Sequence, residues 1–473
     1  MTAPSHAAAR TVVRGGLVVT ASDEIHADVL IEGGRIAALA AHDSDAAAAW
    51  TAGTVIDATG KYVIPGGVDA HTHMQMPFGG TTAADTFETG TRAAAWGGTT
   101  TIVDFAIQSV GQSLRAGLDT WHAKADAQCA IDYGFHMIVS DVTEHTLKEM
   151  DVLVEEGVTS FKMFMAYPGV FYSDDGKILR AMQRAAGNGG LVMMHAENGI
   201  AIDVLVQQAL AAGRTDPRYH GEVRHALLEA EATHRAIQLA RVAGAPLYVV
   251  HVSAQQAVAE LAAARDLGLP VFGETCPQYL FLSTDNLAEP DFEGAKYVCS
   301  TPLRPREHQA ALWQGLRTND LQVVSTDHCP FCFNGQKEMG RGDFSKIPNG
   351  LPGVENRMDL LHQAVVDGHI SRRRWIEIAC ATPARMFGLY PRKGTLAPGA
   401  DADVVIYDPH AEYTVTARDH HMNVDYSAYE GKRLTGRVET VLSRGVPVID
   451  HRQYVGRAGH GRYTPRGTCS YLD

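Results

Sequence analysis

Two histidines separated by one residue end an apolar stretch near the start of the chain. Residues 63–73 read Val-Ile-Pro-Gly-Gly-Val-Asp-Ala-His-Thr-His. In a strand, alternate side chains face the same way, so His71 and His73 would project together. Two neighbouring imidazoles can ligate one metal ion. An isolated His-x-His is better explained by two polar residues on a solvated strand face, so a metal site needs further ligands elsewhere in the chain.

Further polar residues stand at or near the ends of four other apolar segments. Four imidazoles and a carboxylate at one end of one barrel could bind two divalent cations, with zinc the leading choice. Barrel enzymes carry their chemistry at the carboxyl ends of their strands. Each residue alone is better explained as a satisfied core or rim residue, but their coincidence favours a metal site. The four residues are Lys162, His195, His251 and Asp327.

Lys162 lies in an apolar segment, Phe-Lys-Met-Phe-Met at residues 161–165. Burying a charged amine there is costly, so the lysine is either a desolvated amine paired with an acid or a modified side chain. Reaction with CO2 would give a carbamate, an anion whose two oxygens can bridge two metals. Charge balance favours the carbamate, because with Asp327 and a hydroxide it would reduce the charge of two dications to roughly one. We therefore predict N6-carboxylysine at this position.

Apolar strands alternate with helical stretches from residue 62 to residue 327, which is typical of a parallel α/β architecture. Eight such units fit a (β/α)8 TIM-like barrel with insertions. An open doubly wound sheet is the alternative, but the Gly-rich nucleotide loop expected after its first strand is not found. The predicted strands are 62–74, 99–106, 133–140, 160–166, 191–196, 246–253, 271–276 and 321–327.

Short β segments occur at both ends of the chain, separated by Gly and Asp turn residues. We expect them to join in one smaller β-sandwich domain beside the barrel, with residues 1–63 and 391–456 forming the sandwich and 64–390 forming the barrel. Residues 457–473 are rich in Gly and Arg. They predict either a disordered tail or an arm that contacts a neighbouring subunit.

Composition excludes several classes of protein. A net charge of -13 over 473 residues argues against a nucleic-acid partner or an anionic membrane surface. No apolar run approaches the roughly 20 residues of a membrane helix, and residues 1–15 lack a signal-peptide core. Seven scattered cysteines do not predict a disulfide framework. The Cys329–Cys332 pair has redox-motif spacing, but its context favours incidental thiols. We expect a cytoplasmic protein.

Taken together, these motifs resemble the dihydropyrimidinase/D-hydantoinase family of cyclic amidohydrolases. The resemblance runs nearly from end to end, and its motifs are specific when taken jointly. It rests on residues 65–73, 97–105, 161–167, 195–198, 229–232, 347–350 and 353–357. The metal ligands that it implies are His71, His73, carboxylated Lys162, His195, His251 and Asp327.

The resemblance also implies a mechanism. A hydroxide bridging two metals would attack a ring amide carbonyl polarised by one metal and by Tyr167. Asp327 would act first as general base and then as acid toward the leaving ring nitrogen, releasing an N-carbamoyl amino acid. Ser300 and Asn349 match positions that hold the imide ring, largely through backbone groups. Thr301 departs from the family pattern, which often has a second proline there.

The substrate class follows from what comes after the histidine pair. Dihydroorotases, a related group, carry an arginine two residues later to hold a carboxylate, whereas residues 74–78 here read Met-Gln-Met-Pro-Phe. This favours a small neutral cyclic ureide or imide: a 5,6-dihydropyrimidine (dihydrouracil, dihydrothymine) or a 5-substituted hydantoin. Loops 74–82 and 168–172 should form the wall for its ring substituent.

Three questions stay open at this point. Allantoin is an alternative substrate, because it too is a neutral cyclic ureide. A non-enzymatic dihydropyrimidinase-like scaffold protein is the alternative from another class, and retention of all six ligand positions argues against it. The resemblance implies a homo-oligomer, with a tetramer favoured over a dimer.

Overall fold

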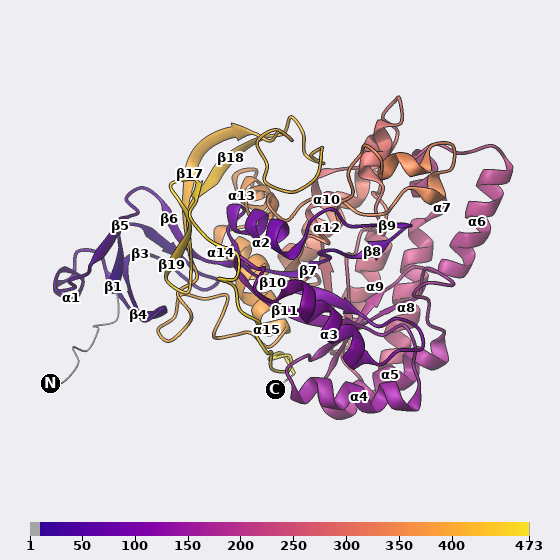
Figure 1. Cartoon of the computed structure of the whole chain (residues 1–473), viewed down its shortest axis with the longest axis horizontal. Coiled ribbons are helices and arrows are strands. Elements are labelled where there is room, and N and C mark those ends of the chain that lie inside the picture. Colours follow the sequence, from indigo (N-terminus) through magenta and orange to yellow (C-terminus); the bar gives the residue numbers. More distant parts are fainter. Residues whose placement is uncertain (1–9, 473) are drawn as a thin grey trace.

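The computed structural model describes residues 10–472. Residues 1–9, which begin the predicted sandwich segment, and Asp473, which ends the predicted tail, lie outside the described residues. Figure 1 shows a body of strands and helices beside a separate β lobe that contains the earliest described strands. The predicted domain boundaries stay predictions.

The eight predicted strands form one parallel sheet, and neighbours along the chain are neighbours in the sheet. The sheet curls until its first and last strands approach each other, where Thr72 and His328 form a parallel bridge and His73 N donates to His328 O at 2.9 Å. The predicted barrel is thereby confirmed. Its strands are β7 (Gly67–Thr72), β10 (Thr99–Ile107), β11 (Asp132–Ile138), β12 (Ser160–Phe164), β13 (Leu191–His195), β14 (Leu247–Val249), β15 (Val271–Thr275) and β16 (Val323–Val324).

The predicted strand 62–74 is two strands in different sheets. β6 (Tyr62–Pro65) pairs with strands of the β lobe, whereas β7 belongs to the barrel. The chain changes sheets at Gly66, where a Cβ would lie 2.1 Å from Thr100 Oγ1. Only glycine permits this close approach, so the change of sheets at this position requires a glycine.

Helices connect the strands and cover the sheet, and most of the long ones start at a side-chain cap. Thr86, Ser113, Thr143 and Asp174 each accept a hydrogen bond from the backbone three residues later, which satisfies an N–H that the helix cannot. The principal helices are α2 (Phe87–Trp96), α3 (Leu114–Ala125), α4 (Glu144–Glu155), α5 (Asp175–Asn188), α6 (Gly199–Ala211), α7 (Arg218–Val223), α8 (Ala226–Ala243), α9 (Gln255–Asp266), α12 (Glu307–Thr318) and α13 (Arg357–Val366). Shorter helices are α1 (Asp45–Ala48), α10 (Pro277–Phe281), α11 (Thr284–Leu287), α14 (Arg372–Ile376) and α15 (Thr382–Met386).

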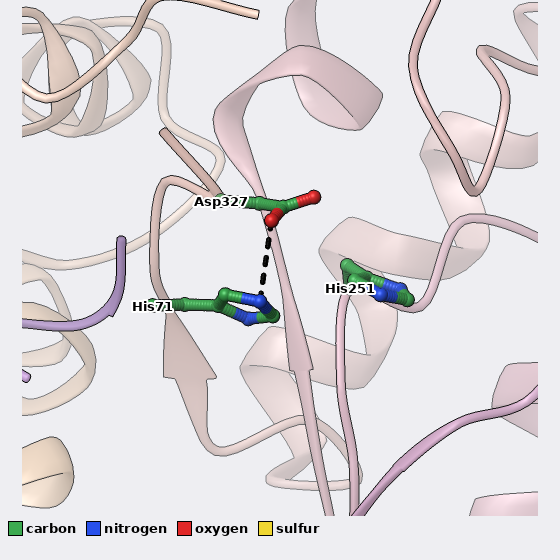
Figure 2. Close-up of side chains that lie close together, drawn as sticks. All are labelled: His71, His251 and Asp327. Carbon is green, nitrogen blue, oxygen red and sulfur yellow. Dashed lines mark ion pairs between the residues drawn. The ribbon is translucent and has the colours of Figure 1, made fainter. Parts of the chain in front are cut away.

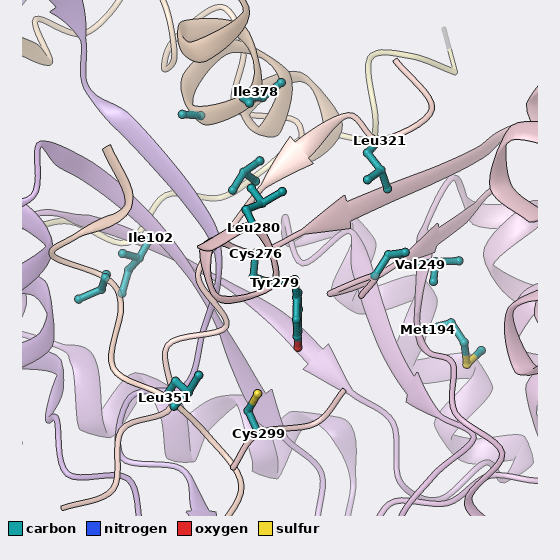
Figure 3. Packing of buried hydrophobic residues seen from close by; sticks show 14 of the residues in the cluster. Ile102, Met194, Val249, Cys276, Tyr279, Leu280, Cys299, Leu321, Leu351 and Ile378 are labelled. Carbon is teal, nitrogen blue, oxygen red and sulfur yellow. The ribbon is translucent and has the colours of Figure 1, made fainter. Parts of the chain in front are cut away.

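The barrel strands are apolar on both faces because both faces are covered. Toward the helices, Met194 and Val249 pack with Leu321 and Leu280 in one large cluster of buried side chains (Figure 3). A second cluster, which includes Phe105 and Tyr248, fills the inside of the barrel. The strand ends are therefore held rigidly from both sides.

The β lobe joins the two ends of the chain, as predicted. β6 pairs with the N-terminal strand β2 (Leu17–Val19) on one side and with the C-terminal strand β17 (Val404–Thr414) on the other. Val13, Val63 and Leu442 lie in its buried core. Its remaining strands are β1 (Arg10–Arg14), β3 (Glu24–Glu32), β4 (Arg35–Ala41), β5 (Thr54–Asp57), β18 (Arg433–Ser443), β19 (Val446–Asp450) and β20 (Gln453–Tyr454).

The last residues lie against the barrel of their own chain and are not a disordered tail. Thr464 N donates to Tyr133 O at 2.7 Å and Arg466 N to Gly157 O at 3.0 Å. The Arg466 side chain is buried and donates to Phe135 O and to Ser160 Oγ. The predicted contact with a neighbouring subunit stays a prediction. Among residues 10–472, no helix combines the length and apolarity needed to cross a membrane.

Candidate metal and active site

The structure brings the six predicted ligand side chains together at the carboxyl end of the barrel. Asp327 Oδ1 lies 3.2 Å from His71 Nε2 and 3.1 Å from His73 Nε2. Lys162 Nζ is also 3.2 Å from His71 Nε2. The His195 and His251 rings are 4.6 Å apart between centroids, and the His71 and His251 rings 5.5 Å. All six side chains are buried.

Several of these nitrogens suit a cation. Ligand atoms of His71, His251 and Asp327 all lie within 4.8 Å of one another, and Figure 2 shows the three side chains with the His71–Asp327 contact dashed. The Nδ1 atoms of His73 and His251 are buried without a hydrogen-bond partner among the described residues. A buried imidazole nitrogen without a partner is costly unless a metal accepts its lone pair.

The protonation states of the site residues also suit metal binding. Burial lowers the pKa of His71, His195 and His251, which keeps these rings in the neutral form that binds metals. Burial opposes ionisation of Asp327, but His71 and His73 outweigh it and lower the pKa of that carboxyl to about 2. Asp327 is therefore a carboxylate at neutral pH.

Lys162 is 1% exposed and lies close to two aromatic rings, 4.7 Å from that of Phe105 and 5.1 Å from that of Phe164. Among the described residues, no carboxylate lies within ion-pair distance of its amine. Burial lowers the pKa of Lys162 to about 8. Much of the amine is therefore uncharged slightly above neutral pH, the form that reacts with CO2.

Two buried glutamates orient the histidine rings. Glu274 accepts from His71 Nδ1, and its other oxygen accepts from Tyr248 at 2.8 Å. Glu197 lies 2.7 Å from His195 Nε2 and accepts from Arg224 at 2.8 Å. Carboxylates behind metal-binding histidines fix the tautomer and raise the basicity of the ring.

These orienting roles are not evident from the sequence, apart from one signal. Glu274 is an acidic residue inside the apolar strand β15. A buried carboxylate of this kind requires a partner. Glu197 stands inside a family motif, but the motif did not reveal its contact with His195. Arg224 lies in a connection between helices, and nothing in its sequence neighbourhood indicates this contact.

Three of the predicted functional residues have unusual backbone conformations. Tyr167, His251 and Asp327 have φ values of 63°, 41° and 51°. Such conformations cost non-glycine residues on the order of 1–3 kcal/mol and cluster at functional sites. Here they occur where strands end and side chains must turn into the cavity.

The predicted ring-binding residues line the same cavity as the metal site. Tyr167 lies 5.4 Å from His195 between ring centroids, and burial raises the pKa of its hydroxyl to about 12, so it stays a donor at neutral pH. Asn349 Nδ2 donates to Ser300 Oγ at 3.0 Å. Thr301, the departure from the family pattern, donates to His251 O at 2.9 Å and so ties this loop to strand β14's end.

One wall of the cavity is largely apolar. Met76 and Phe78 come from the loop after the histidine pair, and Phe171 from the loop after Tyr167, as predicted. Tyr172 instead forms a parallel bridge with Phe164. The full lining is His73, Met76, Phe78, Lys162, Phe164, Tyr167, Phe171, His195, His251, Ser300, Asp327, Cys329, Asn349 and Gly350.

The cysteine pair carries no disulfide. Cys329 is buried and Cys332 is partly exposed, and both are free thiols. Burial raises the pKa of Cys329 well above its ordinary value, which disfavours a reactive thiolate. These observations agree with the interpretation of the pair as incidental.

Known proteins resemble the chain over nearly its whole length. The model of the amidohydrolase family matches residues 62–448. A D-hydantoinase of Streptomyces coelicolor is 84% identical over 463 residues, covering 98% of this chain and 99% of that protein. A D-hydantoinase of Geobacillus stearothermophilus is 50% identical, with coverage of 98% and 97%.

Solved structures give the same result. A dihydropyrimidinase from Brevibacillus agri NCHU1002 is 51% identical in sequence. Its crystal structure superposes with a TM-score of 0.95, covering 97% of this chain and 99% of that one. Sequence and fold therefore agree along the barrel and the β lobe. The chain belongs to the dihydropyrimidinase/D-hydantoinase family of amidohydrolases and is an enzyme that hydrolyses cyclic amides.

Proposed function

We propose that this enzyme hydrolyses the ring amide of 5-substituted hydantoins and of 5,6-dihydropyrimidines such as dihydrouracil and dihydrothymine, and releases N-carbamoyl amino acids. The observation that carries the proposal is that one cavity combines ligands suited to two metals with a neutral, apolar wall. The names of the similar proteins, D-hydantoinase and dihydropyrimidinase, support the same substrate class.

The wall favours a neutral ring with an apolar substituent. Met76, Phe78 and Phe171 offer hydrophobic and aromatic surface to a group on the ring. Residues 74–78 contain no arginine to pair with a substrate carboxylate, which a dihydroorotase-type substrate would require.

The metal site would hold two divalent cations, with zinc the leading choice. The Nε2 atoms of His71 and His73 converge on Asp327 Oδ1, which fits this role, and the anionic Asp327 offsets part of the charge. Carboxylation of Lys162 would add a second anion with two oxygens. Bound there, the cations would supply a hydroxide nucleophile near neutral pH and polarise the ring carbonyl. The proposed ligands are His71, His73, carboxylated Lys162, His195, His251 and Asp327.

The remaining residues act on the ring itself. The Tyr167 hydroxyl, protonated at neutral pH, would donate to the oxygen that becomes negative during attack. Ser300 and Asn349 line the same cavity and would hold the imide, largely through backbone groups. Asp327 would take the nucleophile's proton and deliver it to the leaving nitrogen.

Elemental analysis and a substrate panel test the proposal together. We expect close to two metal ions per subunit and hydrolysis of dihydrouracil, dihydrothymine or phenylhydantoin. Fewer than one metal ion per subunit, with no hydrolysis of any of the three, would overturn it. Allantoin belongs in the panel, because preferential hydrolysis of allantoin would favour the alternative substrate.

Loss of the bridging group gives a sharper test. Lys162→Ala removes the proposed carbamate, so we expect loss of both metal and activity. Full zinc content in Lys162→Ala would show that the carbamate is not needed. We also propose a homo-oligomer, a tetramer rather than a dimer, which sedimentation analysis of the purified enzyme measures directly.

A further inference from the structure

A buried lysine outside the metal site joins two loops that form part of the cavity wall. Lys337 begins the 3-10 helix Lys337–Gly340, and its side chain is 0% exposed. No carboxylate of the described chain lies within ion-pair distance of its amine. Instead, Nζ donates to three backbone carbonyls: Val298 O at 2.8 Å, Pro348 O at 2.7 Å and Gly350 O at 2.8 Å.

Three converging carbonyls match the charged form of the side chain. An ammonium has three N–H donors, one for each carbonyl, whereas a neutral amine has two and would leave one carbonyl without its lysine donor. Burying a cation without an anion is expensive and lowers the pKa of Lys337 to about 7, so the ammonium predominates below that pH. Burial of Lys337 therefore costs folding free energy at a position next to the catalytic cavity.

The three carbonyls belong to the segments that carry the proposed ring-binding residues. Val298 stands two residues before Ser300, and Pro348 and Gly350 flank Asn349. Gly350 N also donates to Val298 O at 3.0 Å. Ser300, Asn349 and Gly350 line the cavity, but Lys337 does not. The lysine therefore acts on this wall from behind.

The ammonium also changes the electronic character of one peptide group. The Pro348 carbonyl and the Asn349 N–H belong to the same peptide, so drawing density toward the carbonyl oxygen makes the N–H a stronger donor. Within residues 10–472, no backbone acceptor takes the Asn349 N–H. Because Asn349 lines the cavity, this N–H can donate to a bound ring.

We propose that Lys337 is a positioning residue for ring binding: its ammonium fixes the two backbone segments beside Ser300 and Asn349 and strengthens the Asn349 N–H as a donor to a carbonyl of the cyclic imide. This inference rests on the proposed function. It assigns the lysine to binding of the ring, and not to the metals or to the bond-breaking step.

Steady-state kinetics of the metal-loaded enzyme test the assignment. In Lys337→Met, which removes the charge and the donors at similar length, we expect KM for dihydrouracil to rise about tenfold or more, the value of one or two lost hydrogen bonds. We expect kcat to change less than KM and the metal content to stay as in the parent enzyme. Lys346→Met is the matched control, because Lys346 lies in the same loop but is exposed and pairs only with Asp343; its KM should not change.

A second variant keeps the test decisive. Lys337→Gln retains two N–H donors without the charge, so its KM should lie between those of the parent and Lys337→Met. An unchanged KM in either folded, metal-loaded variant would overturn the proposal, as would a fall in kcat alone or a loss of metal. Failure of both variants to fold would assign the lysine a purely structural role and would overturn the proposal as well. An inactive parent enzyme would instead count against the proposed function.

Discussion

His251 and His136 are both buried histidines inside the barrel, yet their ring nitrogens differ in hydrogen-bond partners. His136, deeper in the barrel, has partners at both nitrogens: Ser160 Oγ at 2.5 Å and Ala70 O at 2.9 Å. His251, at the cavity, has a buried Nδ1 without a partner among the described residues. Burial lowers the pKa of both rings well below the ordinary value. Burial and a lowered pKa are therefore common to the proposed ligand His251 and to the structural His136, and the two rings differ in their hydrogen-bond partners.

Two buried lysines repeat the contrast. Lys393, where the barrel meets the β lobe, lies 2.6 Å from Asp132, 2.8 Å from Asp403 and 3.1 Å from Asp401. Lys162, also 1% exposed, has no carboxylate at ion-pair distance within the described residues. The first is a satisfied ion-pair network, whereas the second is a buried amine that needs a different solution.

The largest expected difference is between the two histidines. His251→Asn should lose bound metal and fall to the activity of the metal-free protein, because a ligand is removed. His136→Asn should keep both metal and activity while its free energy of unfolding falls by about 1–3 kcal/mol, the cost of buried groups left unpaired. Elemental analysis, dihydrouracil hydrolysis and thermal unfolding measure the two outcomes. Metal loss in a folded His136→Asn would break the comparison.

A pair of tyrosines extends the comparison to the reacting oxygen. Tyr167→Phe removes a donor in the cavity and should lower kcat by about 10²–10³-fold with little change in KM. Tyr133→Phe removes a hydroxyl that donates to Asp126 at 2.6 Å, away from the cavity, and should leave kcat unchanged. Initial-rate kinetics of both variants with the same substrate distinguish the two roles; equal kcat values would remove Tyr167 from the mechanism.

The glutamates behind the rings should have smaller effects. Glu197→Gln weakens the contact that orients His195, and we expect metal affinity or activity to fall about 10–100-fold. Glu231→Gln is the control, because Glu231 is exposed and contacts Asn198 without touching a ring. Competition with a chelator measures the affinities. Equal affinities in the two variants would show that Glu197 does not support the metal site.

Much of this arrangement could be predicted from the sequence. The alternation of apolar strands with helical stretches predicted the barrel. Covered parallel strands are apolar throughout, so polar residues at their ends are easily recognised in the sequence. The six ligand positions followed from those ends and from the resemblance. The sequence could not pair Glu274 with His71 or Glu197 with Arg224, because these contacts join residues 203 and 27 positions apart. Lys337 was missed for a related reason: its acceptors are backbone carbonyls, which carry no residue type to recognise.

The break in the first predicted strand shows another limit. Residues 62–74 have a continuous apolar pattern, and that pattern does not reveal that β6 and β7 enter different sheets. The chain changes sheets at Gly66, where close packing against Thr100 leaves no room for a side chain, and this contact exists only in the folded chain. The predicted tail, 457–473, also contacts the barrel, through residues such as Arg466. Its composition does not indicate these contacts.

The smallest predicted effect concerns the pH dependence of Lys162 carboxylation in the metal-free protein. Only the neutral amine reacts with CO2, and burial lowers the pKa of Lys162 to about 8. Below that pKa the ammonium predominates, so the rate of carbamate formation at fixed dissolved CO2 should rise nearly tenfold between pH 7 and pH 9 and then level off. Carbon-13 NMR with labelled bicarbonate measures the carbamate signal. Lys393 is the internal control, since its three carboxylate neighbours hold the ammonium and disfavour reaction. We therefore expect a carbamate signal that is absent in Lys162→Arg. A rate independent of pH over this range would contradict the assignment of an accessible neutral amine at the open end of the barrel.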